Sequence, residues 1–222
     1  MNPQNPSGWV HHHLLSYIIE YGKAPTLPSL AALCGLNEQN TWDQLKALDV
    51  QKGLLFNPGS DRCWVVPPFA LWPTNFWVKS KAMSWWGNCV WCSLGIAAII
   101  KTDVDIVTRI GAEDETCIIK VRSGKIEPDD LVVHLSIPIA RAWENVIYFC
   151  GTVLAFHNNE GVNQWCHRHS IEKGVILPIN QVWELAKHWY GSYLDTDWSK
   201  WSREEARVIF EEVGLTGDFW KV

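Results

Sequence analysis

The chain has 222 residues, of which 47% are hydrophobic and 19% are charged, and its formal net charge is −5. This apolar content is enough to bury a sizeable core, which excludes a disordered chain and a disulfide-held mini-protein. The acidic balance disfavours nucleic acid as a partner. Fifteen tryptophans are the one unusual feature of the composition.

The sequence has no pattern typical of membrane insertion or export. Its longest apolar run, Val90 to Ile100, is shorter than the about 18 to 20 residues of a transmembrane helix. Residues 1–9 lack the basic start and apolar stretch of a signal peptide. An odd number of cysteines, seven, fits a reducing compartment better than a disulfide framework. We therefore expect a cytoplasmic protein that has no contact with a membrane.

The first third of the chain predicts three short helices followed by a β-hairpin. The expected helices cover 10–21, 28–34 and 40–48, and the expected strands cover 54–56 and 63–66. Prolines between residues 67 and 73 suggest a connector after this unit. We interpret residues 1–78 as a winged-helix-like N-terminal domain.

The remainder, residues 79–222, predicts a domain in which a mixed or antiparallel sheet packs with helices. The expected elements are a helix at 88–100, strands at 104–110, 116–121, 131–135 and 145–156, and helices at 179–190 and 202–213. Ser202 and Glu205 form a capping box at the start of the last helix. A helix, then several strands, then further helices is the order of an α+β fold.

Cys89 and Cys92 form a CxxC pair at the start of the expected helix 88–100. Residues three apart share a helix face, and a helix N-terminus lowers a thiol pKa. Three interpretations are open from this pair alone. It is half of a zinc site that needs two more ligands, a thioredoxin-type motif that needs a βαβ setting, or two small buried thiols.

The segment from Cys89 to Ile100 resembles the active-site helix of the organomercurial (alkylmercury) lyase family. Cys89 stands at the position of the family's first catalytic cysteine, and Phe149-Cys150-Gly151 matches the pattern around the second. Trp165 and His169 occur at the spacing of a tryptophan and a histidine in the family. The resemblance implies an alkylmercury-lyase-like α+β fold, with a winged-helix-like unit before the catalytic domain.

Cys92 stands where the family has its catalytic aspartate. The resemblance implies that the thiolates of Cys89 and Cys150 take the mercury of R–Hg⁺ and that the third group delivers a proton to the departing carbon. Thiolates suit thiophilic metals, and the proton has to come from a positioned group of tuned pKa. The Cys92 thiol is then either the proton donor or a third ligand that holds the metal too tightly for turnover.

Aromatic residues beside the cysteines are expected to form the wall of a dry substrate pocket. The expected wall residues are Trp85, Trp86, Trp91 and Phe149, with Trp64, Trp72 and Trp77 on the segments that lead to them. Exclusion of water would raise the pKa of Cys92 and keep it a thiol. The other tryptophans are expected to be core or helix-packing residues.

The leading hypothesis is an enzyme that binds a small organometallic or thiophilic substrate through Cys89, Cys92 and Cys150 and cleaves a carbon–metal bond by protonolysis, without an organic cofactor. One alternative is a non-catalytic protein that binds Hg, Cu or Zn through three thiolates. Another is a family member recruited to a different carbon–heteroatom substrate in biosynthesis. A DNA-binding regulator is disfavoured, because the expected helices at 28–34 and 40–48 carry only Lys46 as a base.

Other cysteines and histidines have plainer interpretations. Residues 166–169, Cys-His-Arg-His, read as a polar surface loop, and His11 to His13 read as a solvated helix edge. Cys34, Cys63 and Cys117 are expected to be small buried residues.

Overall fold

A computed structural model describes residues 5–222 of the protein. Residues 1–4, part of the segment in which no signal peptide is expected, lie outside the described residues. Within the described range the chain forms eight α-helices and eleven strands, and the strands make two sheets. The α+β fold class that the sequence predicts is confirmed.

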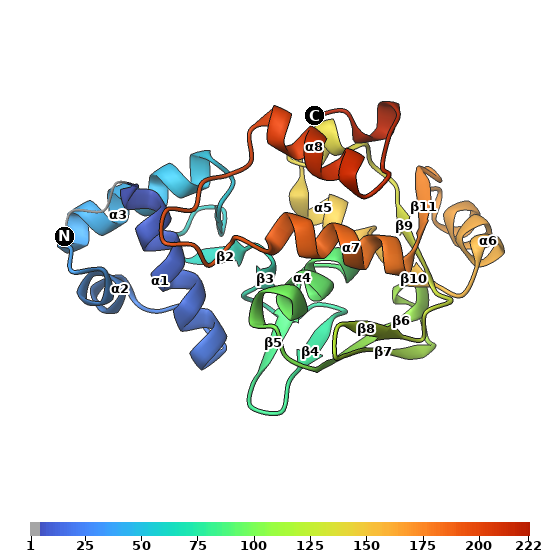
Figure 1. The fold of residues 1–222 in the computed structure, drawn as a ribbon, viewed down its shortest axis with the longest axis horizontal. Coiled ribbons are helices and arrows are strands. Elements are labelled where there is room, and N and C mark those ends of the chain that lie inside the picture. Colours follow the sequence, from blue (N-terminus) through green and yellow to red (C-terminus); the bar gives the residue numbers. More distant parts are fainter. Residues whose placement is uncertain (1–4) are drawn as a thin grey trace.

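Three helices and a hairpin form the N-terminal part, at the left of Figure 1. These elements are α1 (Pro6–Tyr21), α2 (Leu27–Cys34), α3 (Glu38–Val50), β1 (Leu55–Phe56) and β2 (Cys63–Val66). Asn5, Thr26 and Asn37 cap the helices, each accepting a hydrogen bond from a backbone N–H of the first turn. The expected helices and hairpin are confirmed, whereas the winged-helix interpretation stays a prediction.

An eight-stranded antiparallel sheet continues from the hairpin, in the order β1-β2-β3-β5-β4-β6-β7-β8. Its further strands are β3 (Phe69–Ala70), β4 (Trp77–Lys79), β5 (Ser84–Gly87), β6 (Val104–Arg109), β7 (Thr116–Arg122) and β8 (Lys125–Glu127). The strands expected at 104–110 and 116–121 are therefore confirmed. The predicted domain boundary after residue 78 falls within β4, and a division of the chain into two units stays a prediction.

A second, three-stranded sheet and five helices complete the chain. The strands are β9 (Val132–Leu135), β10 (Leu154–Phe156) and β11 (Val175–Pro178), and the helices are α4 (Val90–Ile100), α5 (Val146–Gly151), α6 (Asn159–His169), α7 (Ile179–Tyr190) and α8 (Arg203–Glu212). Short 3-10 turns are η1 (Ile110–Ala112), η2 (Ile139–Arg141) and η3 (Asp218–Trp220). The capping box of α8 is present, with both of its hydrogen bonds formed.

Two expectations about secondary structure are wrong. Residues 145–156 form α5 and then β10 rather than one strand, because the Asn145 side chain accepts a hydrogen bond from the Tyr148 N–H at 3.0 Å and so starts a helix. An apolar run of this length does not by itself distinguish a strand from a helix. Residues 166–169 form the last turn of α6 rather than a loop.

Helices α4 and α7 pack side by side at the centre of the molecule (Figure 1). α4 is apolar and buried over almost its whole length, so it is a core helix without a solvent face. Gly95 allows the close approach, because a methyl group at this position would lie 2.3 Å from Cδ2 of Tyr190 on α7. This packing places Tyr190, on α7, opposite the first turn of α4.

Replacement of Gly95 by alanine is expected to destabilise the fold by about 1 to 3 kcal/mol, because the new methyl group forces the Tyr190 ring away. Urea-induced unfolding measures this change in the free energy of unfolding. Gly151→Ala is the matched control, since no atom lies within 4 Å of the added methyl group. Equal unfolding midpoints for the two variants would contradict the role of Gly95.

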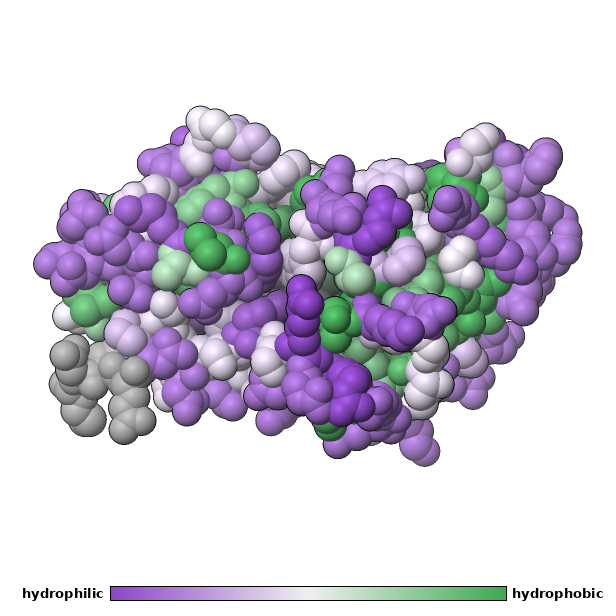
Figure 2. Space-filling model, turned by 90° about the horizontal axis from the view of Figure 1, so that it is seen from above, coloured by the Kyte–Doolittle hydropathy of each residue, from purple (hydrophilic) through white to green (hydrophobic). Residues whose placement is uncertain are grey.

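Polar residues predominate on the face shown in Figure 2, and apolar residues form small separate patches there. Among the described residues, no helix has the length and apolar character needed to cross a bilayer.

Candidate active site

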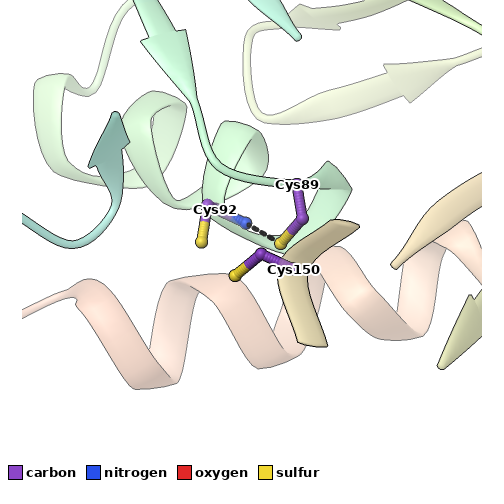
Figure 3. Close-up of side chains that lie close together, drawn as sticks. All are labelled: Cys89, Cys92 and Cys150. Carbon is purple, nitrogen blue, oxygen red and sulfur yellow. Dashed lines mark hydrogen bonds between the residues drawn. The ribbon is translucent and has the colours of Figure 1, made fainter. Parts of the chain in front are cut away.

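The side chains of the three cysteines of the sequence-predicted site lie close together (Figure 3). Cys89 is the N-cap of α4, Cys92 lies in the first turn of the same helix, and Cys150 lies in α5. Their sulfur atoms are all within 4.8 Å of one another, and all three residues are buried. Within residues 5–222 this is the one cluster of three or more His, Cys, Asp or Glu ligands spaced closely enough for a metal ion.

The turn from β5 into α4 positions the first two thiols. Gly87 ends β5 with a Cβ position only 2.2 Å from Oγ of Ser93, so only glycine fits where the strand meets the helix. Ser93 donates its hydroxyl to the Cys89 carbonyl at 2.7 Å. The Cys92 N–H donates to Sγ of Cys89 at 3.3 Å, which fixes that sulfur over the helix N-terminus (Figure 3).

Hydrogen bonds decide which thiol carries the negative charge. Donation from Cys150 and Cys89 holds the pKa of Cys92 well below its ordinary value, and the Tyr190 hydroxyl, 3.4 Å from the Cys92 sulfur, acts in the same direction. Burial raises the pKa of Cys89, and hydrogen bonds to the other two thiols raise that of Cys150. These hydrogen bonds favour the thiolate form at Cys92 over that of Cys89 or Cys150. The expectation that the pKa of Cys92 is raised is wrong in direction, because its hydrogen-bond donors outweigh burial.

Removal of the Tyr190 hydroxyl tests this assignment. In Tyr190→Phe the Cys92 thiolate loses one hydrogen bond, so the pKa of Cys92 is expected to rise and less thiolate to form at a given pH. Thiolate absorbance in the ultraviolet, followed against pH in the reduced, metal-free protein, measures the shift. Tyr148→Phe, at an exposed position on α5, is expected to leave the titration unchanged. Identical titrations for both variants would exclude Tyr190 as a donor to Cys92.

The cysteines open into a small, mainly apolar cavity of about 50 Å³. Trp91 and Phe149, both expected in the wall, do line it, together with Tyr190 and Tyr193. Trp143, between η2 and α5, and Trp189, on α7, also line it, although the sequence suggested that they are packing residues. The helical pattern of 179–190 indicates a buried face, but nothing in it points toward the cysteines.

Trp85 and Trp86 do not line the cysteine cavity, and the expectation that they form its wall is wrong. The Trp85 indole N–H donates to the Ile18 carbonyl of α1 at 3.0 Å, and the Trp86 ring packs on Trp77 with centroids 4.2 Å apart. Side chains alternate between the two faces of β5, so sequence proximity to Cys89 does not place either indole near its sulfur. Trp72 and Trp86 instead line a separate groove beside α2 and α3.

The remaining candidates lie outside the cavity. Trp165 donates its indole N–H to the Gly111 carbonyl at 2.8 Å, and His169 contacts Glu113 at 2.9 Å, so both attach α6 to η1 and the turn after it.

His11 is fully buried rather than solvated, stacked on Trp198 with centroids 3.8 Å apart. Of the three thiols expected to be buried, Cys34 is buried, whereas Cys63 and Cys117 are half-buried.

The family model of alkylmercury lyase matches residues 69–191, more than half of the chain. The chain belongs to the alkylmercury lyase family. A crystal structure of the mercury-bound form of MerB2 has a similar fold, with a TM-score of 0.67 and 19% sequence identity over 87% of this chain and 93% of that chain. No curated protein matches the sequence. The matched alkylmercury lyase region contains Cys89, Cys92, Cys150 and Tyr190, and it ends before Lys200, another residue of the cavity.

Proposed function

We propose that this protein binds a small organomercurial through Cys89, Cys92 and Cys150 and cleaves its carbon–mercury bond by protonolysis. The observation that carries the proposal is the convergence of three buried thiols within 4.8 Å in a chain of the alkylmercury lyase family. Thiolates are soft ligands and prefer thiophilic metals, and the mercury-bound form of MerB2 has a similar fold. No organic cofactor is needed for this reaction.

In the proposed reaction, Cys92 supplies the proton that the departing carbon receives. When R–Hg⁺ binds the sulfurs of Cys89 and Cys150, both thiols lose their protons; one passes to the Cys92 thiolate and the other leaves to solvent. Two thiolates on one mercury increase the electron density on the bound carbon. The carbon–mercury bond then breaks, its electron pair takes the proton from Cys92, and the hydrocarbon R–H departs. The Cys92 thiolate becomes the third ligand of Hg²⁺. Cys92 thus acts first as a base and then as an acid.

The size of the cavity favours a short alkyl group. A cavity of about 150 Å³ takes up benzene, and a water molecule has a share of about 30 Å³ in the liquid. The cysteine cavity, with about 50 Å³, has room for a methyl group on a metal held by the cysteines but not for a phenyl ring without rearrangement. Methylmercury is therefore the first substrate to test.

Methane release tests the proposed reaction. The reduced protein is incubated with methylmercury in a sealed vial, and gas chromatography measures methane across the acid, neutral and alkaline range. At least one methane per chain is expected. No methane above the level of a protein-free control at any pH would overturn the lyase function.

A second candidate, retention of a soft metal without turnover, follows from the same third thiol. Three thiolates hold Hg²⁺, Cu⁺ or Zn²⁺ more firmly than two thiolates and a carboxylate, so Cys92 would favour storage over release. Cys92→Asp discriminates between the candidates, since it introduces the carboxyl group of the family pattern. Methane release by this variant but not by the natural protein would assign the natural protein to metal retention.

All seven cysteines are free, and the three in the cavity have to stay reduced for either function. This requirement supports the proposal that the protein works in a reducing compartment such as the cytoplasm.

A further inference from the structure

Lys200, in the segment between α7 and α8, faces the same cavity as the three cysteines. In the part of the chain that the structure describes, it is the one Lys, Arg, Asp or Glu among the residues that line this cavity. Its ammonium nitrogen lies 4.4 Å from the centroid of the Trp143 ring and 5.3 Å from that of Trp189, so two indoles hold it by cation–π contact. The ammonium group of a lysine that is half-buried beside an apolar cavity is stabilised by an anionic partner.

The charged groups around Lys200 leave one such partner. No carboxylate among residues 5–222 forms an ion pair with it, whereas Cys89, Cys92 and Cys150 line the same cavity, and a negative charge on Cys92 favours its ammonium form. His11 is the other titratable group that interacts with it, and burial and the Lys200 charge lower the pKa of His11 to about 3, so this imidazole is neutral. Burial lowers the pKa of Lys200 to about 7 despite the opposing effect of a negative charge on Cys92.

We propose that Lys200 is the counter-charge of the cysteine cluster. Its single positive charge neutralises the one net negative charge of a divalent soft metal bound by three thiolates. This inference rests on the proposed function. Lys200 acts through the thiolates, so it is a positioning residue rather than a catalytic one.

The charges of the proposed reaction support this role. When one thiol of the cluster is ionised, its charge balances the ammonium group of Lys200. With R–Hg⁺ held by two thiolates beside the Cys92 thiol, the cluster carries one net negative charge, which Lys200 again balances. After the hydrocarbon leaves, Hg²⁺ with three thiolates has the same net charge. The cavity therefore stays neutral throughout, which avoids the cost of an unpaired charge in an apolar site.

The same reasoning predicts different numbers of sulfur ligands for metals of different charge. A monovalent ion such as Cu⁺ with three thiolates carries two negative charges, of which Lys200 balances only one. Such an ion is expected to be held by two thiolates while the third cysteine stays a thiol. The natural protein is thus expected to bind Hg²⁺ through three sulfurs and Cu⁺ through two.

Lys200→Met tests the proposal, because methionine keeps much of the side-chain length and removes the charge. X-ray absorption of the reduced protein loaded with Hg²⁺ alone gives the number of sulfur ligands. Three are expected for the natural protein and two for Lys200→Met, with an affinity for Hg²⁺ at least about tenfold lower in competition with a small dithiol. Lys187→Met is the matched control, since Lys187 also lies over an indole, that of Trp183 at 5.5 Å, but half-exposed on α7. It is expected to behave as the natural protein.

Three sulfur ligands and unchanged affinity in Lys200→Met would overturn the inference while leaving the proposed function intact. If that variant does not fold, the comparison of Hg²⁺ with Cu⁺ in the natural protein decides, and three sulfur ligands for Cu⁺ would overturn the inference. A natural protein that binds no Hg²⁺ would remove the proposed function itself.

Discussion

Cys92→Ala is expected to slow the first-turnover release of methane from methylmercury by about 10²- to 10⁴-fold, the usual contribution of a positioned general acid. Alanine removes the group that receives a proton as mercury binds and returns it to the departing carbon. Cys89 and Cys150 remain, so the variant is expected to bind methylmercury and to retain the methyl group. Methane measured by gas chromatography after mixing protein in excess over methylmercury gives the single-turnover rate.

Cys117→Ala is the control for this experiment, because Cys117 is a half-buried thiol on β7 outside the cavity. Its rate of methane release is expected to equal that of the natural protein. A Cys92→Ala variant that releases methane at the natural rate would show that the proton comes from another group, and the assignment of Cys92 would be wrong.

Cys89→Ser and Cys150→Ser are each expected to lower the affinity for Hg²⁺ by more than about 100-fold, since the loss of even an outer-shell partner of a metal ligand typically costs about 10- to 100-fold. A hydroxyl group is a hard and weakly acidic ligand that replaces a soft thiolate poorly. Equilibrium dialysis against a competing dithiol measures the affinity. Cys63→Ser, in β2 and outside the cavity, is the matched control. Unchanged retention in either cavity variant would exclude that sulfur as a ligand.

Local sequence patterns predicted most of the helices and strands. Residues 179–190 and 202–213 form helices close to the expected bounds because an amphipathic repeat, and at Ser202 a capping box, act within a few residues. The strand predicted at 145–156 is wrong because a run of apolar residues is compatible with either a strand or a helix. The Asn145 side chain decides between them, since it caps a helix at the start of this run.

The cysteine cluster was predicted through the family resemblance, whereas its surroundings depend on tertiary packing. Cys89 and Cys92 share one helix, but Cys150 joins them only because the fold brings its sulfur, on α5, within 4.8 Å of theirs. Trp143, Trp189 and Lys200 enter the cavity from distant segments, and no local pattern indicates this. The lowered pKa of Cys92 follows from donors on three elements, which no local pattern indicates, so the sequence alone predicts a shift in the opposite direction.

A native mass spectrum of the reduced protein after reaction with one equivalent of methylmercury tests carbon–mercury cleavage most directly, because it reports binding and cleavage on the same molecule. We expect the mass of the chain with one mercury and no methyl group, with Cys89, Cys92 and Cys150 protected from alkylation. A chain that carries mercury with its methyl group still attached, after prolonged incubation at any pH, would contradict the proposed reaction.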